Sequence, residues 1–473
     1  MLFTAATLAD GRTRDVRVRD GEIVAVAPTL DPDPGEETVD ASEYHLLPGA
    51  VDAHVHFRQP GYPHKEDWTT GSRAAAAGGV TTVVDQPNTD PATVDGAAFD
   101  TKAELAADSL VDYGLNGGVT ADWDPEGLFE RPLFALGEVF LADSTGDMGI
   151  DEELFQAALA RASDADVPVT VHAEDATLFE PAALEGNDES GAGDGTSADT
   201  DGTSADTDGT TVDGNGRAGD ATGRAAPADR WSRYRPAEAE VAAVETALAA
   251  AEREGASIHV AHTSTPEAVD RVAAAAAEAD DDRRVTCEVT PHHLLLSRDD
   301  LDALGTFGRM NPPLRSERRR AALFERVRDG TVDLIATDHA PHTTAEKETA
   351  LTDAPSGVPG VETLLPLLLG EVVADRLDVA RVRDLVAATP AAVFGLPQKG
   401  RVAPGSDADL VLVDLDDPDE VRGERLHSKC EWTPFEGARA VFPELTLLRG
   451  QVVYDGRGDA EQFGEAIGRN VRE

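Results

Sequence analysis

Short apolar segments rich in Val, Ile and Thr alternate with Ala-rich amphipathic segments along the middle of the chain. This alternation is typical of repeated βα units around a parallel sheet. The strand pattern occurs eight times, at residues 50–57, 81–88, 113–119, 134–141, 168–174, 258–263, 285–291 and 332–339. Helices are expected at about 68–77, 103–110, 152–162, 237–253, 266–277 and 317–328. The pattern predicts an α/β fold, a (β/α)₈ TIM-type barrel, whose functional groups lie at the carboxyl ends of the strands.

The two ends of the chain have a different pattern. Residues 1–49 and 396–473 contain short alternating strands such as VRVRDGEIVAVAP and LTLLRGQVVYDG, punctuated by Gly, Pro and Asp. Neither end makes a sheet with a core of its own, so we expect the two to form one small β-sandwich beside the barrel. The barrel then occupies residues 50–395.

One segment of the barrel region, at about residues 185–229, has almost no large apolar side chain and repeats the sequence DGTSADT. Such a composition cannot bury a core. We interpret the segment as a disordered acidic insertion in a surface loop, because long loops are tolerated at low entropic cost. A functional lid is the less favoured alternative, since the segment offers no apolar or aromatic anchor.

The charge balance restricts the partners. The 473 residues include 41 Lys and Arg against 90 Asp and Glu, a net charge of −49, which opposes binding to nucleic acid or to anionic membranes. No apolar run approaches the roughly 20 residues of a membrane span, and the first residues lack a secretory signal, so a cytoplasmic protein is expected. Dispersed acidic residues with few lysines are typical of a halophilic protein, because concentrated counterions screen its self-repulsion.

Histidines stand at the ends of several predicted strands. His54 and His56 are two residues apart and share one face of a strand, a spacing that suits Zn²⁺ or a similar metal. His172 ends the fifth strand, His262 ends the sixth, and the eighth ends in the segment ATDHAPH. The two cysteines are far apart and lack CxxC spacing, so they predict neither a disulfide framework nor a cysteine zinc site.

The remaining histidines are weaker candidates. We prefer His262 to His259 as a ligand because it stands at the end of its strand. Structural or surface roles are expected for His45, His64 and His427. Support of a ligand and simple packing both stay open for His292, His293 and His339.

Taken in order, the motifs resemble those of the cyclic-amide branch of the amidohydrolase superfamily, and within it dihydroorotase. They cover nearly the whole chain and read PGAVDAHVHFRQPG, GGVTTVVDQPNT, VHAED, IHVAHTST, CEVTPHHL, NPPLR, ATDHAPH and SKCEWTPFEG. The related dihydropyrimidinases (hydantoinases) and allantoinases typically differ at TPHHL and DHAPH. An ordered series of this kind is much more specific than any single motif.

The resemblance implies a binuclear zinc enzyme that reversibly hydrolyses dihydroorotate to N-carbamoyl-L-aspartate in pyrimidine (UMP) biosynthesis. By this resemblance His54 and His56 hold one zinc, and His172 and His262 hold the second. Asp338 is a ligand of the first zinc and the catalytic proton shuttle. A homo-oligomer, or association with another enzyme of the same pathway, is left open.

The substrate carries a carboxylate, and the guanidinium of Arg58, two positions after the HxH pair, suits a bidentate grip on it. The resemblance adds Asn88, Asn311 and His342 as substrate-binding residues. Taken alone, Arg58 would be interpreted as part of a surface salt bridge, Asn88 as a turn residue and Asn311 as a loop cap.

The chain departs from the family at the metal bridge. Where the family commonly has a carboxylated lysine, the segment LGEVFL places Glu138, and no lysine lies between Lys102 and Lys347. Glu138 is therefore the expected bridge, because a carboxylate also supplies one negative charge and two oxygens. Asp143 and Asp147 are alternative bridges, although exposed loop acids are the simpler interpretation of both.

Two other functions remain open. A hydantoinase or allantoinase acts on a neutral ring, which gives Arg58 no carboxylate to bind. A non-catalytic amidohydrolase-like scaffold would hold little zinc, and only the altered bridge at Glu138 favours it.

Overall fold

The computed structural model describes residues 1–142, 148–185, 228–280, 283–458 and 460–473. The predicted insertion at about 185–229 lies almost wholly outside the described residues, and so do Asp143 and Asp147. Within the described ranges, no helix combines the length and the apolar character that crossing a membrane requires.

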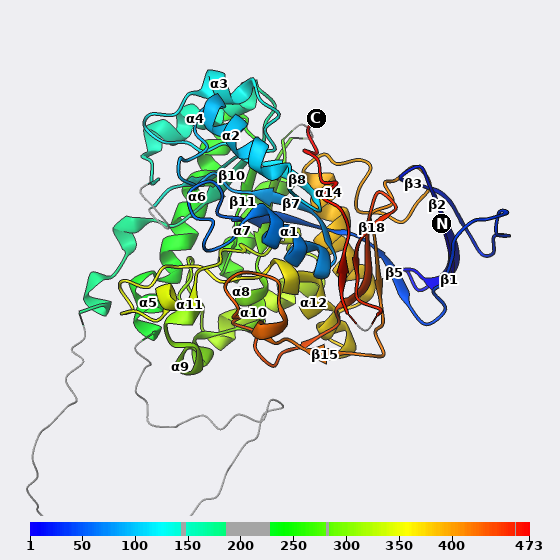
Figure 1. The fold of residues 1–473 in the computed structure, drawn as a ribbon. Coiled ribbons are helices and arrows are strands. Elements are labelled where there is room, and N and C mark those ends of the chain that lie inside the picture. Colours follow the sequence, from blue (N-terminus) through cyan, green and yellow to red (C-terminus); the bar gives the residue numbers. More distant parts are fainter. Residues whose placement is uncertain (143–147, 186–227, 281–282, 459) are drawn as a thin grey trace, which may run out of the picture.

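In the part of the chain that the structure describes, eight parallel strands form the barrel at the centre of the molecule (Figure 1). They are β6 (Ala50–Val55), β7 (Val80–Asp85), β8 (Asp112–Leu115), β9 (Leu136–Phe140), β10 (Val169–His172), β11 (Ile258–Val260), β12 (Val285–Val289) and β13 (Leu334–Ile335). Strands β6 to β8 pair in chain order, as do β9 to β13. Single parallel bridges from Gly117 to Leu136 and from Val55 to His339 join these two groups, and this confirms the predicted barrel.

The helices pack around the strands. The longer ones are α1 (Trp68–Ala77), α2 (Gly96–Ala106), α4 (Glu152–Asp164), α6 (Ala237–Glu254), α7 (Pro266–Glu278), α10 (Glu317–Asp329) and α12 (Leu364–Val373). The short ones are α3 (Pro125–Phe129), α5 (Asp229–Tyr234), α8 (Pro291–Leu295), α9 (Leu301–Leu304), α11 (Thr344–Lys347), α13 (Val379–Arg383) and α14 (Thr389–Val393). Helix α2 begins seven residues before the expected 103–110, because the Asp95 carboxylate caps it by accepting a hydrogen bond from the Ala98 N–H.

Described residues from both ends of the chain build a nine-stranded sheet beside the barrel. Its strands are β1 (Leu2–Thr7), β2 (Thr13–Arg19), β3 (Glu22–Ala27), β4 (Thr38–Asp40), β5 (His45–Pro48), β14 (Leu410–Val413), β17 (Pro443–Leu448), β18 (Gln451–Asp455) and β19 (Gln462–Phe463). Antiparallel pairing of β5 with β14 joins the N-terminal strands, blue in Figure 1, to the C-terminal ones, orange to red. A separate pair, β15 (Asp419–Glu420) and β16 (Arg439–Ala440), lies after β14 in the sequence.

A buried ionic cluster fastens this sheet to the barrel. The Lys399 ammonium lies 2.8 Å from Asp112 on β8 and 2.6 Å from Asp409 beside β14. Arg449, at the end of β17, also pairs with Asp112 at 2.5 Å. Because all these charges are paired, the cluster fixes the sheet without leaving a buried charge uncompensated.

Candidate metal centre

Six of the predicted site residues meet at the carboxyl end of the barrel. His54 and His56 come from the end of β6, Glu138 from β9 and His172 from β10, while His262 follows β11 and Asp338 follows β13; all six are buried. They converge because parallel strands of a barrel end at the same rim.

Glu138 lies between the two pairs of histidines. Its Oε1 is 3.1 Å from His172 Nδ1 and 2.5 Å from His262 Nε2, while its Oε2 is 3.4 Å from His54 Nε2. Ligand atoms of His54, His56 and Glu138 lie within 4.8 Å of one another, and so do those of Glu138, His172 and His262. One carboxylate is thus shared by two groups of three ligands.

Asp338 adds a second carboxylate on the side of the first pair. Its Oδ1 lies 3.0 Å from His56 Nε2 and 3.5 Å from His54 Nε2. Two ligands on one tetrahedral zinc at about 2.1 Å are separated by about 3.4 Å, close to several of these distances. In addition, His54 Nε2 is buried with no hydrogen-bond partner among the described residues, although it faces both carboxylates. The donor set therefore fits a metal site.

A glycine lets β9 approach its neighbour closely beside Glu138. Gly137 has φ +130°, and a Cβ there would lie 2.2 Å from the Thr170 carbonyl oxygen on β10. Only glycine adopts this conformation without a clash. The close approach brings the short Glu138 side chain to the histidine of β10.

Polar partners hold three of the four ligand imidazoles. His54 Nδ1 lies 2.6 Å from Glu288, and His172 Nε2 lies 3.0 Å from Glu174. His56 Nδ1 lies 2.7 Å from Asn88 Oδ1, so Asn88 contacts a candidate ligand and also lines the pocket. When these nitrogens carry the proton, the opposite ring nitrogen of each histidine is left with its lone pair toward the carboxylates.

Charge interactions shift the pKa values within the cluster. Burial raises the pKa of Glu138, but the neighbouring His262 and His54 outweigh it and hold the carboxyl well below its usual range. Burial lowers the pKa of His172, yet Glu138 and Glu174 outweigh it and raise the value to about 9. The carboxylates of the site therefore favour positive charge on the groups beside them, as a cation site requires.

The main chain is strained at three site residues. Arg58, His262 and Asp338 have φ values of +64°, +32° and +47°, in the left-handed region that non-glycine residues rarely adopt. Such conformations persist only where the surrounding structure enforces them, and they cluster at functional sites.

Arg58 lines the pocket next to the ligand cluster and is 4% exposed. Within the described part of the chain, no carboxylate pairs with its guanidinium, which instead contacts the Pro341 carbonyl at 3.3 Å and His342 Nε2 at 3.2 Å. Burial lowers its pKa to about 10, so it remains charged at neutral pH. A buried arginine without an anionic partner provides a binding site for an anionic ligand.

The other two predicted substrate residues are placed differently. Asn311 lines the pocket and accepts a hydrogen bond from Trp231 Nε1 at 3.0 Å. His342 lies behind Arg58, where its Nε2 is 2.9 Å from the Ser356 carbonyl and its Nδ1 is 3.1 Å from the Lys65 ammonium. His342 thus contacts Arg58 rather than the pocket itself.

Sequence reasoning missed Glu288 and Trp231. Glu288 was detectable as an acidic residue inside the apolar segment VTCEV, because a buried acid at a strand end needs a partner. Trp231 follows the acidic insertion and carried no such signal.

The histidines left open are buried, and the main chain of His339 hydrogen-bonds to the main chains of His54 and His56. His293 Nε2 donates to the Pro312 carbonyl at 2.9 Å, and burial lowers its pKa to about 3. His339 Nδ1 accepts from the Gly360 N–H at 3.0 Å, and its ring packs edge-on against Phe57. His292 is buried, and its ring packs against that of His293.

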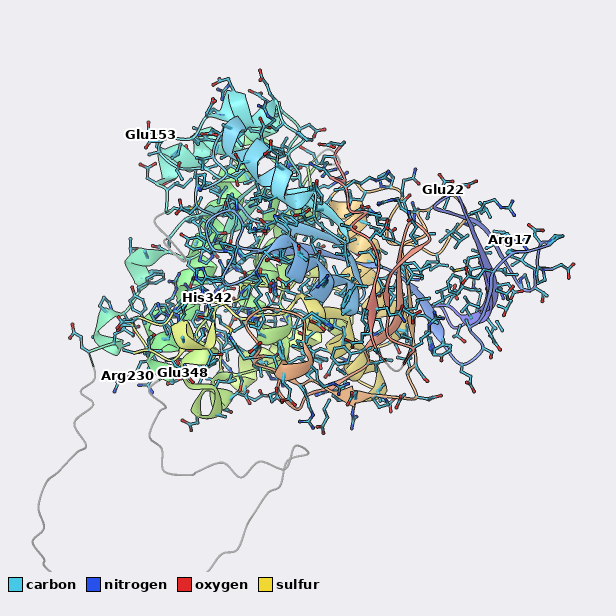
Figure 2. All side chains as sticks on the ribbon, viewed as in Figure 1. Arg17, Glu22, Glu153, Arg230, His342 and Glu348 are labelled. Carbon is cyan, nitrogen blue, oxygen red and sulfur yellow. The ribbon has the colours of Figure 1, made fainter. Side chains whose placement is uncertain are left out.

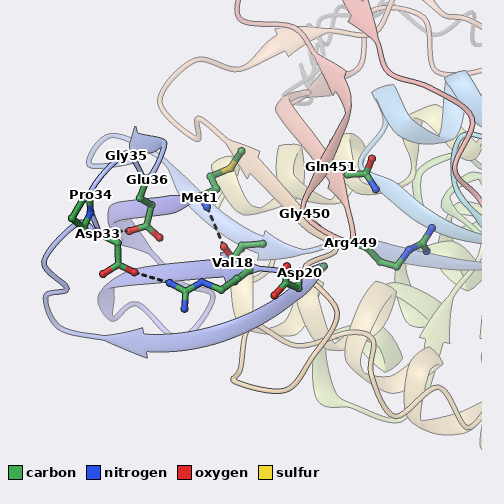
Figure 3. Close-up of a pocket in the computed structure, with 12 residues that line it drawn as sticks. Met1, Val18, Asp20, Asp33, Pro34, Gly35, Glu36, Arg449, Gly450 and Gln451 are labelled. Atoms are coloured by element: carbon green, nitrogen blue, oxygen red, sulfur yellow. Dashed lines mark hydrogen bonds and ion pairs between the residues drawn. The ribbon is translucent and has the colours of Figure 1, made fainter.

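A larger cavity of about 710 Å³ lies on the nine-stranded sheet, between its N-terminal strands and the turn that joins β17 to β18 (Figure 3). Oppositely charged side chains line it, such as Arg19 and Asp33, which pair at 2.6 Å. Figure 2 shows Arg17 and Glu22 of these strands on the opposite side of the molecule from His342. The cavity is therefore separate from the metal centre.

Comparison with known proteins gives consistent results. A family model described as "Dihydro-orotase-like" matches residues 44–190, and one described as "Amidohydrolase family" matches residues 224–453. A dihydroorotase from Halobacterium salinarum is 57% identical over 99% of both chains, in agreement with the halophilic interpretation of the charge. One from Methanosarcina mazei is 41% identical over 93% of this chain and 90% of its own length. The solved structure of an L-hydantoinase (dihydropyrimidinase) from Arthrobacter aurescens has a TM-score of 0.85 and 26% identity, and the match covers 99% of this chain and 98% of that one.

Proposed function

Because the chain belongs to the dihydroorotase family, we propose that it reversibly hydrolyses (S)-dihydroorotate to N-carbamoyl-L-aspartate. This reaction is a step of pyrimidine (UMP) biosynthesis, which we place in the cytoplasm. The guanidinium of Arg58 is buried beside the ligand cluster and pairs with no carboxylate of the described residues, and this observation carries the choice of substrate.

The metal set we propose is two Zn²⁺ ions that share Glu138. His54, His56 and Asp338 would hold one ion, and His172 and His262 the other, on the grounds of the distances given above. Bound zinc supplies a nucleophilic water at neutral pH and polarises the amide carbonyl of the substrate.

The protein's own groups then orient the ring and move the proton. Arg58 would bind the substrate carboxylate with two parallel hydrogen bonds, and the Asn311 amide would contact the ring. Asp338 lines the same pocket, and we propose that it accepts the proton of the attacking water and delivers it to the leaving ring nitrogen. Burial raises the pKa of Asp338, but His56 and His54 outweigh it and lower the value, so the group is a carboxylate at neutral pH.

Arg58 also separates this function from its alternatives. A hydantoinase or allantoinase acts on a neutral ring, and the buried positive charge of Arg58 would then lack an anionic partner. A non-catalytic scaffold has no need for the intact set of four histidines around Glu138.

The test is Arg58→Met, assayed with dihydroorotate and with the neutral ring dihydrouracil. Hydrogen bonds to a charged group contribute about 1.5–3 kcal/mol, so kcat/KM for dihydroorotate should fall about tenfold to a hundredfold or more. The exposed Arg12→Met is the matched control and should retain wild-type kinetics. Unchanged dihydroorotate turnover in Arg58→Met would contradict the proposed substrate.

A further inference from the structure

Glu288 on β12 contacts parts of both groups of ligands without belonging to either. It is 1% exposed, and its Oε1 lies 2.6 Å from His54 Nδ1 and accepts a hydrogen bond from the His262 main-chain N–H at 3.1 Å. Its Oε2 lies 3.0 Å from the Nε2 of His259, a buried histidine with no place among the ligands.

We propose that Glu288 is a positioning residue that sets one ligand of each metal at the same time, and that His259 holds Glu288 in place. This inference rests on the proposed two-zinc centre and assigns a role within it to two residues that contact neither metal nor substrate.

The contact with His54 fixes its tautomer. When Nδ1–H donates to Glu288, the lone pair of Nε2 points to Glu138 and Asp338, 3.4 and 3.5 Å away. A carboxylate on the far nitrogen of a ligating imidazole also makes that imidazole a stronger donor to a metal. Glu288 therefore determines that His54 would bind a metal through Nε2.

The contact with His262 fixes its main chain. The φ of His262 is +32°, which is unfavourable for a residue with a side chain, so the conformation needs outside support. The hydrogen bond from its N–H to Glu288 supplies that support at the residue whose Nε2 lies 2.5 Å from Glu138. One carboxylate oxygen thus acts on both sides of the centre.

His259 completes the arrangement. Its Nδ1 lies 2.8 Å from Thr286 Oγ1, so the hydroxyl can donate to Nδ1 while Nε2–H donates to Glu288 Oε2. With one oxygen held by His259, only the other faces the ligands. Glu174 offers a useful contrast, because it contacts His172 alone among the ligands and pairs with Arg235 at 2.6 Å on its other side.

The experiment compares Glu288→Gln with Glu174→Gln, two substitutions that keep the side-chain shape and remove the charge. Zinc retained per subunit is measured at equilibrium with a chelator of known affinity, and melting of the metal-free proteins checks that each is folded. Loss of a residue that supports a ligand typically weakens metal binding about tenfold to a hundredfold. We expect that loss for both ions in Glu288→Gln and for only one ion in Glu174→Gln.

Wild-type affinity for both ions in Glu288→Gln, or loss of only one, would overturn the inference. Should Glu288→Gln not fold, His259→Gln provides the test, because it leaves Glu288 in place and should also weaken the binding of both zinc ions. Wild-type zinc affinity in His259→Gln would equally overturn the inference. Failure of the wild-type protein to bind two zinc ions would instead overturn the proposed metal centre, so the two failures are distinguishable.

Discussion

Glu138→Ala removes the carboxylate shared by both groups of ligands, and we predict that it abolishes binuclear metal binding. The two oxygens of Glu138 reach His54 on one side and His172 and His262 on the other, at 2.5–3.4 Å. Without them His54 and His56 keep the Asp338 carboxylate, which lies 3.0 Å from His56. His172 and His262 lose the one carboxylate of their group of ligands. Zinc content should therefore fall from two ions to at most one.

The effect on rate follows from the same geometry. Metal-assisted activation of the substrate lowers the barrier by several kcal/mol, and a loss of about 4 kcal/mol lowers kcat about a thousandfold. We expect a fall in kcat of that size for Glu138→Ala. Glu138→Asp separates charge from reach, because the loss of one methylene withdraws the carboxylate by about 1.5 Å, too far to span both pairs. We expect Glu138→Asp to behave like Glu138→Ala in zinc stoichiometry.

The assay is zinc per subunit by elemental analysis together with kcat for dihydroorotate. Glu130→Ala is the control, since that side chain is 79% exposed and follows α3, outside the ligand cluster. A Glu138→Ala protein that keeps two zinc ions and the wild-type rate would show that another residue bridges the metals, with Asp143 next in line.

Three further predictions concern single residues. Asp338→Asn should fold normally but lose about 10²–10⁴-fold in kcat, because the Asp338 carboxylate moves the proton. Circular dichroism checks the fold and kinetics the rate, and a fully active variant would contradict proton transfer by Asp338. Trp231→Phe keeps an aromatic ring but removes the N–H that donates to Asn311. Because such a hydrogen bond contributes about 1 kcal/mol, KM for dihydroorotate should rise about fivefold, and an unchanged KM would contradict the role of Trp231 in holding Asn311. Burial lowers the pKa of His427, but Glu362 outweighs it and raises the value above 6.5. The charge of His427 therefore stabilises the fold below pH 6.5 while Glu362, whose own pKa burial raises, stays ionised, and this effect is lost as pH rises through the raised pKa of His427. The stability difference between wild type and His427→Gln, from denaturant unfolding, should be larger at pH 5.5 than at pH 8.5, and the reverse order would contradict the assignment.

The sequence was sufficient for the barrel and for the residues gathered at its rim. His54 and His56 are predictable because a two-residue spacing places them on one strand face, and His172 stands out at the end of an apolar strand. Local patterns of this kind need no knowledge of which strands pair.

The supporting contacts could not be predicted, because they depend on tertiary placement. Glu288 reaches His54 only because the barrel closes and brings β12 and β6 to the same rim. Trp231 reaches Asn311 only through the way the chain returns after the acidic segment. The place of His342 behind Arg58, rather than in the pocket, likewise follows from packing between loops.

We propose above that this site opens a ring carrying a carboxylate. The direct measurement is turnover of dihydroorotate, dihydrouracil, hydantoin and allantoin by the zinc-loaded protein in multimolar KCl, which screens a net charge of −49. We expect selective opening of dihydroorotate. Preference for a neutral ring would contradict the role of Arg58, and failure to open any of the four would contradict catalysis by the centre around Glu138.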